Sequence, residues 1–212
     1  EGYLFVHNAP GVGHLFRKHL PRARLCLYMH NRLFDTYGRR ELSDTVNTWD
    51  HLICVSRFLK DYVASKLGRD CGKCSVVLNG VDTGFLRPVP RQETEVPTVL
   101  FLGRVIPEKG VDLLVRAAVL LKERGVPFRL EIVGSSGFAA SDPLPEYEEE
   151  LRQLAVPLGE QVSFQPFVRR DEILHCYGRA DIFCVPSNWD DPCPLTALEG
   201  LACGLPSVMS RR

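Results

Sequence analysis

The sequence predicts an α/β protein with two parallel β-sheets, and three observations support this prediction. Short apolar runs alternate with longer segments of helical period, which is the pattern of repeated βα units. The pattern is interrupted once, over residues 79–97, where glycines, prolines and acids exclude a strand or helix of any length. Four strand candidates precede this interruption and five follow it, so we expect two domains.

The expected strands are short runs rich in β-branched and aromatic residues. They are Tyr3–Val6, Leu25–Met29, His51–Val55, Ser75–Leu78, Thr98–Leu102, Phe128–Val133, Gln161–Phe164, Ile182–Val185 and Ser207–Met209. Segments of helical period lie between them, at Arg57–Leu67, Gly110–Arg124, Glu146–Ala155, Asp171–Arg179 and Leu195–Ala202. Ser56 and Asp171 stand where a capping side chain is expected.

These elements divide the chain into a partial N-terminal domain over residues 1–82, a linker over residues 83–97 and a C-terminal domain over residues 98–212. The chain opens almost at once on a strand and closes with Arg211 and Arg212 directly after one. Because a parallel sheet needs both faces covered, we expect a protein that is truncated at both ends.

The composition is that of a globular protein, with 45% hydrophobic and 25% charged residues. Lys and Arg total 26, as do Asp and Glu, so no net charge draws nucleic acid or an anionic membrane. The basic stretch from Arg17 to Arg24 is interpreted as a solvated helix end, and peripheral membrane contact is a weaker alternative. No apolar run has bilayer length and no signal peptide opens the chain, which predicts a cytoplasmic protein.

The chain has 8 cysteines, most of them inside apolar runs where a reduced thiol serves as a small hydrophobe. Cys71 and Cys74 have the spacing of a zinc knuckle or a redox pair. No second Cys or His pair lies at a suitable distance, and the pair precedes a strand rather than a helix. We therefore interpret it as an ordinary turn.

The first segment that indicates chemistry, Phe101–Gly110, runs from a strand through a glycine turn into a helix. In open parallel sheets, ligands gather at the carboxyl ends of strands, where glycine lets an anion approach the backbone and the next helix offers free N–H groups. Arg104 and Lys109 add two cations suited to a diphosphate. Taken alone, the segment fits a solvated basic turn equally well.

The second such segment, from Val185 to Pro206, leads from a strand through an acidic loop into a helix that begins near Pro194. Asp191 lies in the loop, and Glu199 is expected to face outward from the second turn, so that both reach one ligand across the helix N-terminus. Carboxylates that accept from vicinal hydroxyls suit a sugar or a ribose. The alternative makes Asp191 a helix cap and Glu199 a surface residue.

Three ordered motifs together resemble the retaining glycosyltransferases of family 4, and the resemblance covers essentially the whole chain. The motifs are Leu78-Asn79-Gly80-Val81-Asp82 with Phe85 and Pro88, then Gly103-Arg104 with Glu108-Lys109-Gly110, and then Asp191-x7-Glu199 with Ala202-Cys203-Gly204-Leu205-Pro206. The resemblance implies the GT-B fold, which has two Rossmann-like domains. The acceptor side belongs to the first domain and the donor side to the second.

The resemblance also implies a role for each matching residue. Arg104 and Lys109 would hold the diphosphate of a nucleotide-sugar donor, and Gly103 would let the backbone come close. Glu199 would bind the ribose hydroxyls, and Asp191 would contact the transferred sugar. The family usually has glutamate at the position of Asp191, so the shorter side chain changes the reach.

Two loops near the expected donor also match the family. Cys193-Pro194 stands where many relatives have an aromatic residue and glycine, and Pro194 removes one N–H, which leaves the amides of Cys193 and Leu195 as phosphate donors. The loop that starts at Gly134 and ends at Gly137 resembles the one near the donor base, and it fits a plain connection equally well.

The N-terminal half contributes weaker candidates. His30 ends an expected strand, and in similar enzymes this position faces the sugar, although a structural histidine is an alternative. Arg57 is a possible acceptor or phosphate contact by the same resemblance, while Ser56 is expected to cap its helix.

The implied reaction moves a sugar from a nucleoside diphosphate to a hydroxyl of a sugar, glycan or lipid-linked acceptor, with retention at the anomeric carbon. Arg104, Lys109, Asp191 and His30 are the expected catalytic residues, and neither a metal nor a cofactor is expected. Two alternatives remain at this point: a truncated nucleotide-sugar-binding module without catalysis, and another enzyme of the same fold, such as a sugar epimerase.

Overall fold

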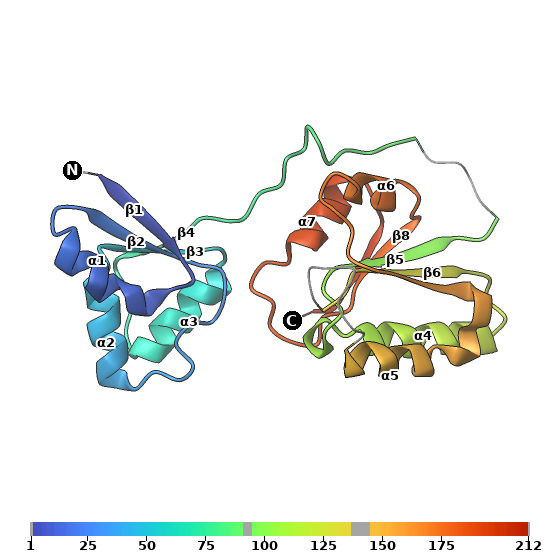
Figure 1. The fold of residues 1–212 in the computed structure, drawn as a ribbon, viewed down its shortest axis with the longest axis horizontal. Helices are drawn as coiled ribbons and strands as arrows, with labels where there is room; N and C mark the ends of the chain where they lie inside the picture. Colours follow the sequence, from blue (N-terminus) through green and yellow to red (C-terminus); the bar gives the residue numbers. More distant parts are fainter. Residues whose placement is uncertain (1, 91–94, 137–144, 212) are drawn as a thin grey trace. The chain divides into compact units, whose positions relative to one another are not determined.

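The computed structural model describes residues 2–90, 95–136 and 145–211 (Figure 1). The chain divides into two units, one formed by residues 1–79 with 191–193 and the other by residues 80–190 with 194–212. Each unit holds one parallel β-sheet, and each sheet has its own hydrophobic core. The predicted α/β class with two parallel sheets is confirmed.

The sheet of the first unit has four strands in the order β1-β2-β3-β4, all parallel. The strands are β1 (Tyr3–His7), β2 (Arg24–Met29), β3 (His51–Cys54) and β4 (Cys74–Val76). The helices between them are η1 (Pro10–Val12), α1 (Gly13–His19), α2 (Arg39–Thr48) and α3 (Arg57–Leu67). Ser56 caps α3 as predicted, because its hydroxyl accepts from the Leu59 amide at 3.4 Å.

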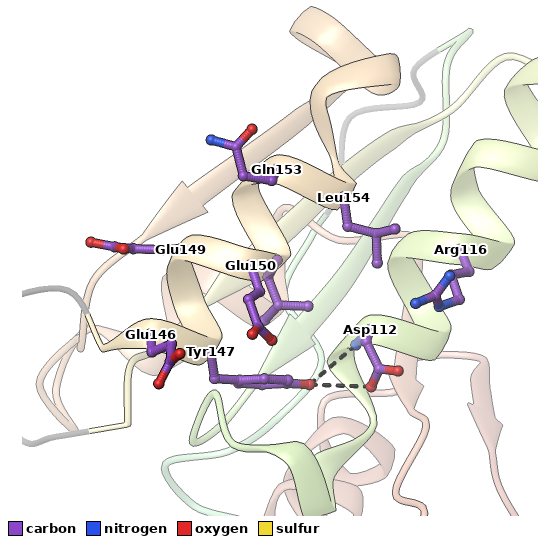
Figure 2. Close-up of a pocket in the computed structure, with 9 residues that line it drawn as sticks. Asp112, Arg116, Glu146, Tyr147, Glu149, Glu150, Gln153 and Leu154 are labelled. Carbon is purple, nitrogen blue, oxygen red and sulfur yellow. Dashed lines mark hydrogen bonds between the residues drawn. The ribbon is translucent and has the colours of Figure 1, made fainter.

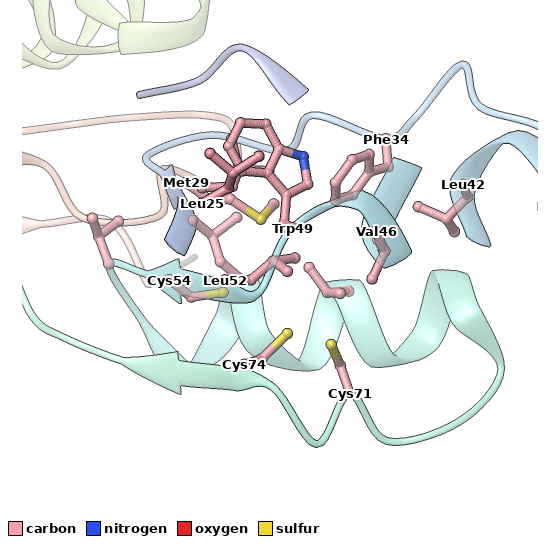
Figure 3. Close-up of a cluster of buried hydrophobic side chains, with 14 residues drawn as sticks. Leu25, Met29, Phe34, Leu42, Val46, Trp49, Leu52, Cys54, Cys71 and Cys74 are labelled. Atoms are coloured by element: carbon pink, nitrogen blue, oxygen red, sulfur yellow. The ribbon is translucent and has the colours of Figure 1, made fainter. Parts of the chain in front are cut away.

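The core of this unit lies between the sheet and helices α2 and α3 (Figure 3). Trp49, which is 1% exposed, fills its centre, and the indole N–H donates to the Pro10 carbonyl at 3.2 Å. That bond removes the cost of burying the one polar atom of the side chain.

The predicted turn at Cys71 and Cys74 lies against this core, with Cys54 beside it (Figure 3). A hydrogen bond to the Cys74 thiol raises the pKa of Cys71, and a hydrogen bond to Cys54 raises the pKa of Cys74 to about 12. Thiols that hold their protons this strongly are poor nucleophiles. Within the described ranges, no cluster of three or more His, Cys, Asp or Glu side chains is placed to hold a metal ion.

The second unit has a sheet of five parallel strands in the order β7-β6-β5-β8-β9. These strands are β5 (Thr98–Leu102), β6 (Arg129–Val133), β7 (Val162–Gln165), β8 (Ile182–Val185) and β9 (Ser207–Met209). Its helices are η2 (Pro107–Lys109), α4 (Val111–Glu123), α5 (Glu146–Leu154), η3 (Val156–Gln161), α6 (Ile173–Gly178) and α7 (Leu195–Ala202). Helices α4 and α5 cover one face of the sheet, and α6 and α7 cover the other (Figure 1).

Two helices and one cap differ from the expectations. Helix α2 was not predicted, because it buries only Leu42, Thr45 and Val46, and of the seven-residue helix α1 only the basic end that starts at Arg17 was expected. Asp171 does not cap α6, since the residue at the N-cap is Glu172 and its side chain makes no capping bond. Here the chain forms a turn before the helix starts.

Part of the segment expected as a linker is packed into the second unit. Leu86 is fully buried in its core, and Phe85 packs beside it. Val89 and Pro88 lie so close to Gly178 and Gly204 that a methyl group at either glycine would crowd them. Residues 91–94 of the expected linker lie outside the described residues.

Candidate functional site

The turns that follow β5, β6 and β7 are joined by backbone hydrogen bonds at the carboxyl edge of the second sheet. The Gly103 amide donates to the Val133 carbonyl at 3.0 Å, and the Gly134 amide donates to the Gln165 carbonyl at 3.0 Å. A Cβ added at Gly134 would overlap the Gly103 carbonyl oxygen. Both glycines have positive φ, 154° at Gly103 and 130° at Gly134. Glycine at position 134 therefore lets the two turns pack closely at this edge, where ligands of open parallel sheets gather.

The loop that starts at Gly134 is held at its first residues. The Val105 amide donates to the Ser135 carbonyl at 3.1 Å, and the Ser136 amide donates to a carboxylate oxygen of buried Glu148 at 2.7 Å. Gly137, the last residue of the predicted loop, lies outside the described residues. The described part of this turn is therefore held by hydrogen bonds, and a role near the donor base stays a prediction.

The turn after β5 also lies directly against the loop after β8. The Asn188 amide donates to the Glu108 carbonyl at 3.1 Å, and its side-chain amide donates to the Pro107 carbonyl at 2.9 Å. Gly110 has φ of 63°, and a Cβ there would overlap the Pro186 carbonyl oxygen. The two segments that indicated chemistry in the sequence, residues 101–110 and 185–206, are thus in contact.

The two predicted cations sit on the first of these segments. Arg104 is exposed, while Lys109 is half-buried at the end of η2. The Lys109 ammonium lies 6.0 Å from the centroid of the Trp189 ring, within the range of a cation–π contact. This contact links Lys109 to the loop after β8.

That same loop carries two unsatisfied polar atoms. Among the described residues, the Ser187 hydroxyl and the Trp189 indole N–H are buried without a hydrogen-bond partner. Native proteins seldom leave such groups unpaired. A polar ligand or a water molecule at this loop would satisfy them.

Glu199 lies on α7 as predicted, but its position differs from the expectation. It is 4% exposed, so it neither faces outward nor forms a surface residue. One carboxylate oxygen accepts from the Arg170 guanidinium at 2.7 Å and the other accepts from the Tyr177 hydroxyl at 3.0 Å. These two donors compensate the desolvation that burial imposes on a carboxylate.

The other residues predicted for this part of the site lie at or before the start of α7. Pro194 is the N-cap and Leu195, 47% exposed, is the first helical residue, so its amide lies at the helix N-terminus. Asp191 and Cys193 precede the helix and group with the first unit. That Asp191 and Glu199 reach one ligand therefore stays a prediction.

His30 follows β2 in the first unit and is part of a histidine pair. Its Nε2 lies 2.9 Å from Nδ1 of His7, and its backbone amide donates to the Asn8 side chain at 2.8 Å. The His30 ring also stacks on Tyr28, with centroids 4.8 Å apart. Burial, and then the neighbouring charge of His7, lower the pKa of His30.

Several residues of these sites were not singled out from the sequence. His7-Asn8 stands at the end of β1, much as His30-Asn31 directly follows β2, and this repeated His-Asn pair is a signal that could have identified His7. Arg170 carried a weaker signal, as a cation shortly after a strand. Tyr177 lies within a helical segment, and nothing in the sequence distinguishes it from a core aromatic residue.

A separate groove lies between α4 and α5, as Figure 2 shows. Acidic side chains dominate its lining, with Arg116 as the basic member. Tyr147 bridges the two helices, since its hydroxyl donates to the Asp112 carboxylate at 3.2 Å, and burial raises its pKa to about 12. No residue predicted for the site lines this groove.

Family models match nearly the whole chain. The model described as Glycosyl transferases group 1 matches residues 82–212, more than half of the chain. The chain belongs to this family. A second model, described as Glycosyltransferase Family 4, matches residues 3–85, which confirms the resemblance stated for the sequence.

Two named proteins are similar to this chain over most of its length. Spore coat protein SA of Bacillus subtilis is 26% identical over 99% of the chain and 59% of its own length. The D-inositol 3-phosphate glycosyltransferase of Acidothermus cellulolyticus is 35% identical over 82% of the chain and 41% of its own length. The chain thus spans only part of the length of these relatives.

Among solved structures, HepE of Anabaena in complex with UDP and glucose has a TM-score of 0.75 and 19% identity. The match covers 97% of this chain and 58% of that one. The predicted fold class, two Rossmann-like parallel-sheet domains of the GT-B type, is confirmed by this likeness.

In the part of the chain that the structure describes, no helix combines the length and the apolar character needed to cross a bilayer.

Proposed function

We propose that this protein transfers a sugar from a nucleoside-diphosphate sugar to a hydroxyl of a sugar, glycan or lipid-linked acceptor. The observation that supports this most strongly is the carboxyl edge of the second sheet. There the Gly103 and Gly134 backbones approach each other without side chains, next to Arg104. Two half-buried glycines with a neighbouring exposed cation suit the diphosphate of such a donor.

The difficult step is departure of the nucleoside diphosphate, because negative charge grows on it. Arg104 and Lys109 stabilise that charge in this proposal, aided by the Leu195 amide at the start of α7. The two cations supply charge compensation that needs no metal. Unchanged turnover after treatment with EDTA is expected, and loss of activity that Mg²⁺ or Mn²⁺ restores would contradict it.

The remaining contacts follow the family resemblance. Glu199 accepts from the ribose hydroxyls, Asp191 contacts the transferred sugar, and His30 is a further contact of that sugar. We propose retention at the anomeric carbon, with attack on the face that the diphosphate leaves. NMR of the first-formed product decides this point, because an inverted anomeric proton coupling would exclude it.

One similar protein supports a nucleotide-sugar donor, and a second supports sugar transfer. HepE has also been solved in complex with UDP-glucose. The Acidothermus relative is named as a glycosyltransferase that acts with D-inositol 3-phosphate.

We also propose that the protein acts in the cytoplasm. All eight cysteines are free thiols in the structure, which suits a reducing compartment. Detection of disulfides in protein isolated from cells under acid quenching would contradict this location.

The first test of the proposed function is calorimetric titration with UDP-, GDP- and ADP-sugars, followed by a turnover assay. Replacing Arg104 or Lys109 with Ala should weaken binding of the preferred donor by about 1.5–3 kcal/mol, the contribution of a charge-assisted hydrogen bond. Arg124→Ala is the control, because Arg124 is exposed, as Arg104 is, but it lies at the C-terminal end of α4.

The results of these two assays distinguish a transferase from a module that only binds the nucleotide sugar. Binding with turnover supports the transferase, and binding without turnover supports a nucleotide-sugar-binding module. Donor affinity that is unchanged in both the Arg104 and the Lys109 variants would exclude this site.

A further inference from the structure

Each oxygen of the Glu199 carboxylate accepts a hydrogen bond, one from a neutral hydroxyl and the other from a charged guanidinium. The Tyr177 hydroxyl donates to Oε2 at 3.0 Å, and the Arg170 guanidinium donates to Oε1 at 2.7 Å. Both partners are distant in sequence, at 22 and 29 residues. The orientation of this side chain is therefore set by tertiary contacts and not by its own helix.

Tyr177 is the rigid partner. It is fully buried, and its ring packs edge-on against Phe183 with centroids 5.4 Å apart. Its hydroxyl also lies 3.4 Å from the Thr196 carbonyl, but a hydroxyl has one proton, and the nearer, charged oxygen of Glu199 is the stronger acceptor. Tyr177 thus fixes one oxygen of the carboxylate against the core.

Arg170 is the exposed partner. Its side chain is 62% exposed, whereas that of Glu199 is 5% exposed, so the ion pair spans the boundary between solvent and core. The turn that carries Arg170 is closed locally, because the Arg169 amide donates to the Glu172 carboxylate at 3.0 Å. Arg170 therefore approaches Glu199 from a hydrogen-bonded turn on the solvent side.

The arrangement leaves Glu199 able to accept further hydrogen bonds. A carboxylate offers about four lone-pair positions, and Arg170 and Tyr177 are the donors that the described contacts assign to it, one on each oxygen. A carboxylate already held in one orientation loses little side-chain entropy when it binds a ligand.

We propose that Tyr177 and Arg170 are positioning residues that aim the Glu199 carboxylate at the ribose hydroxyls of a bound nucleoside diphosphate. The inference rests on the proposed function, and it adds that recognition of the ribose depends on two residues outside the family motifs. Neither residue needs to touch the sugar. Each acts through the orientation of Glu199.

The test measures discrimination between ribose and deoxyribose. Dissociation constants are determined by calorimetry for UDP, GDP and ADP and for their 2′-deoxy and 3′-deoxy counterparts. For the wild-type protein we expect the preferred ribonucleotide to bind at least about 10-fold more tightly than one of its deoxy forms, as expected for a charge-assisted hydrogen bond. Glu199→Gln should reduce this ratio.

In Tyr177→Phe and in Arg170→Gln the ratio should fall to within about 3-fold, because Glu199 is no longer held in place. Arg170→Lys should restore part of it, since Lys keeps a charged donor without the planar fork. Arg169→Gln is the matched control, because Arg169 is the neighbouring exposed arginine and pairs with Asp171 instead. Its ratio should equal that of the wild type.

The outcomes distinguish this inference from the function on which it rests. If the wild type does not discriminate, or Glu199→Gln keeps the full ratio, the ribose assignment fails and the inference fails with it. If those two results are as expected but Arg170→Gln keeps the full ratio, the positioning role alone is overturned. Equal weakening of ribo- and deoxynucleotides, with a lowered unfolding midpoint, would show a merely structural role. Arg170 is exposed, so its variants are expected to fold even if Tyr177→Phe does not.

Discussion

Glu199 and His30 are both paired with side chains that are distant from them in the sequence. Glu199 is buried and accepts from two donors, and the His30 ring contacts the rings of both Tyr28 and His7. The partners orient the Glu199 carboxylate, and His7 contributes to lowering the pKa of His30. Burial without these partners would cost several kcal/mol for the carboxylate.

The histidine pair gives a prediction about pH. The pKa of His30 is lowered from its ordinary 6.5, first by burial and then by the charge of His7. The unfolded chain therefore takes up the proton first as pH falls. The contribution of His30 to stability is present above pH 6.5 and declines as pH falls below that value.

NMR titration of the His30 imidazole is expected to give a pKa below 6.5. In His7→Phe, which keeps an aromatic ring for stacking but removes the charge, the His30 pKa should move back toward that value. A His30 pKa at or above 6.5 in the wild type would contradict the described environment.

Helix termini show how single residues define the elements. Helix α3 starts after the Ser56 cap and ends before Gly68, which has φ of 67° and whose amide donates to the Ala64 and Ser65 carbonyls to close the last turn. Residues other than glycine rarely adopt this left-handed conformation. Helix α7, by contrast, has Pro194 at its N-cap and no side-chain capping bond, which leaves its first amides open to a ligand.

Gly68→Ala should therefore lower the free energy of unfolding by about 1–2 kcal/mol through backbone strain alone. An added Cβ at Gly68 meets nothing within 4 Å, so no steric clash contributes. Gly72→Ala is the control, because that glycine also has open space and has no left-handed φ. Chemical denaturation measures both variants, and equal stability of the two would contradict the strain argument.

The division into two units with separate cores predicts how the whole chain unfolds. Leu59, fully buried in the first unit, belongs to a different cluster from the residues around the second sheet. The 2 tryptophans are also divided, with Trp49 in the first unit and Trp189 in the second. In a Trp189→Phe background, fluorescence thus reports on the first unit alone.

In that background, Leu59→Ala should destabilise the first unit by about 2–5 kcal/mol, as large-to-small core substitutions do. The fluorescence midpoint should fall, while the part of the circular dichroism transition that belongs to the second unit stays in place. Leu15→Ala, at a leucine that is 57% exposed, should change little. A single transition shifted as a whole would show that the units unfold together.

Much of the fold could be predicted from the sequence because buried parallel strands are short and continuously apolar. Strands β5, β8 and β9 have the predicted bounds, as do helices α3 and α7. Helix α2 could not be predicted, because a mostly polar helix that buries only three residues gives little periodic signal.

The sequence by itself determined the βα order, the two sheets and the motif residues Gly103, Arg104, Lys109 and Glu199, because local periodicity and spacing carry that information. Tertiary structure alone decided that Glu199 is buried between Arg170 and Tyr177, and that Gly134 contacts the Gly103 backbone. These contacts join segments tens of residues apart. They form only when the strands align and bring their carboxyl ends to one edge, which no local pattern encodes.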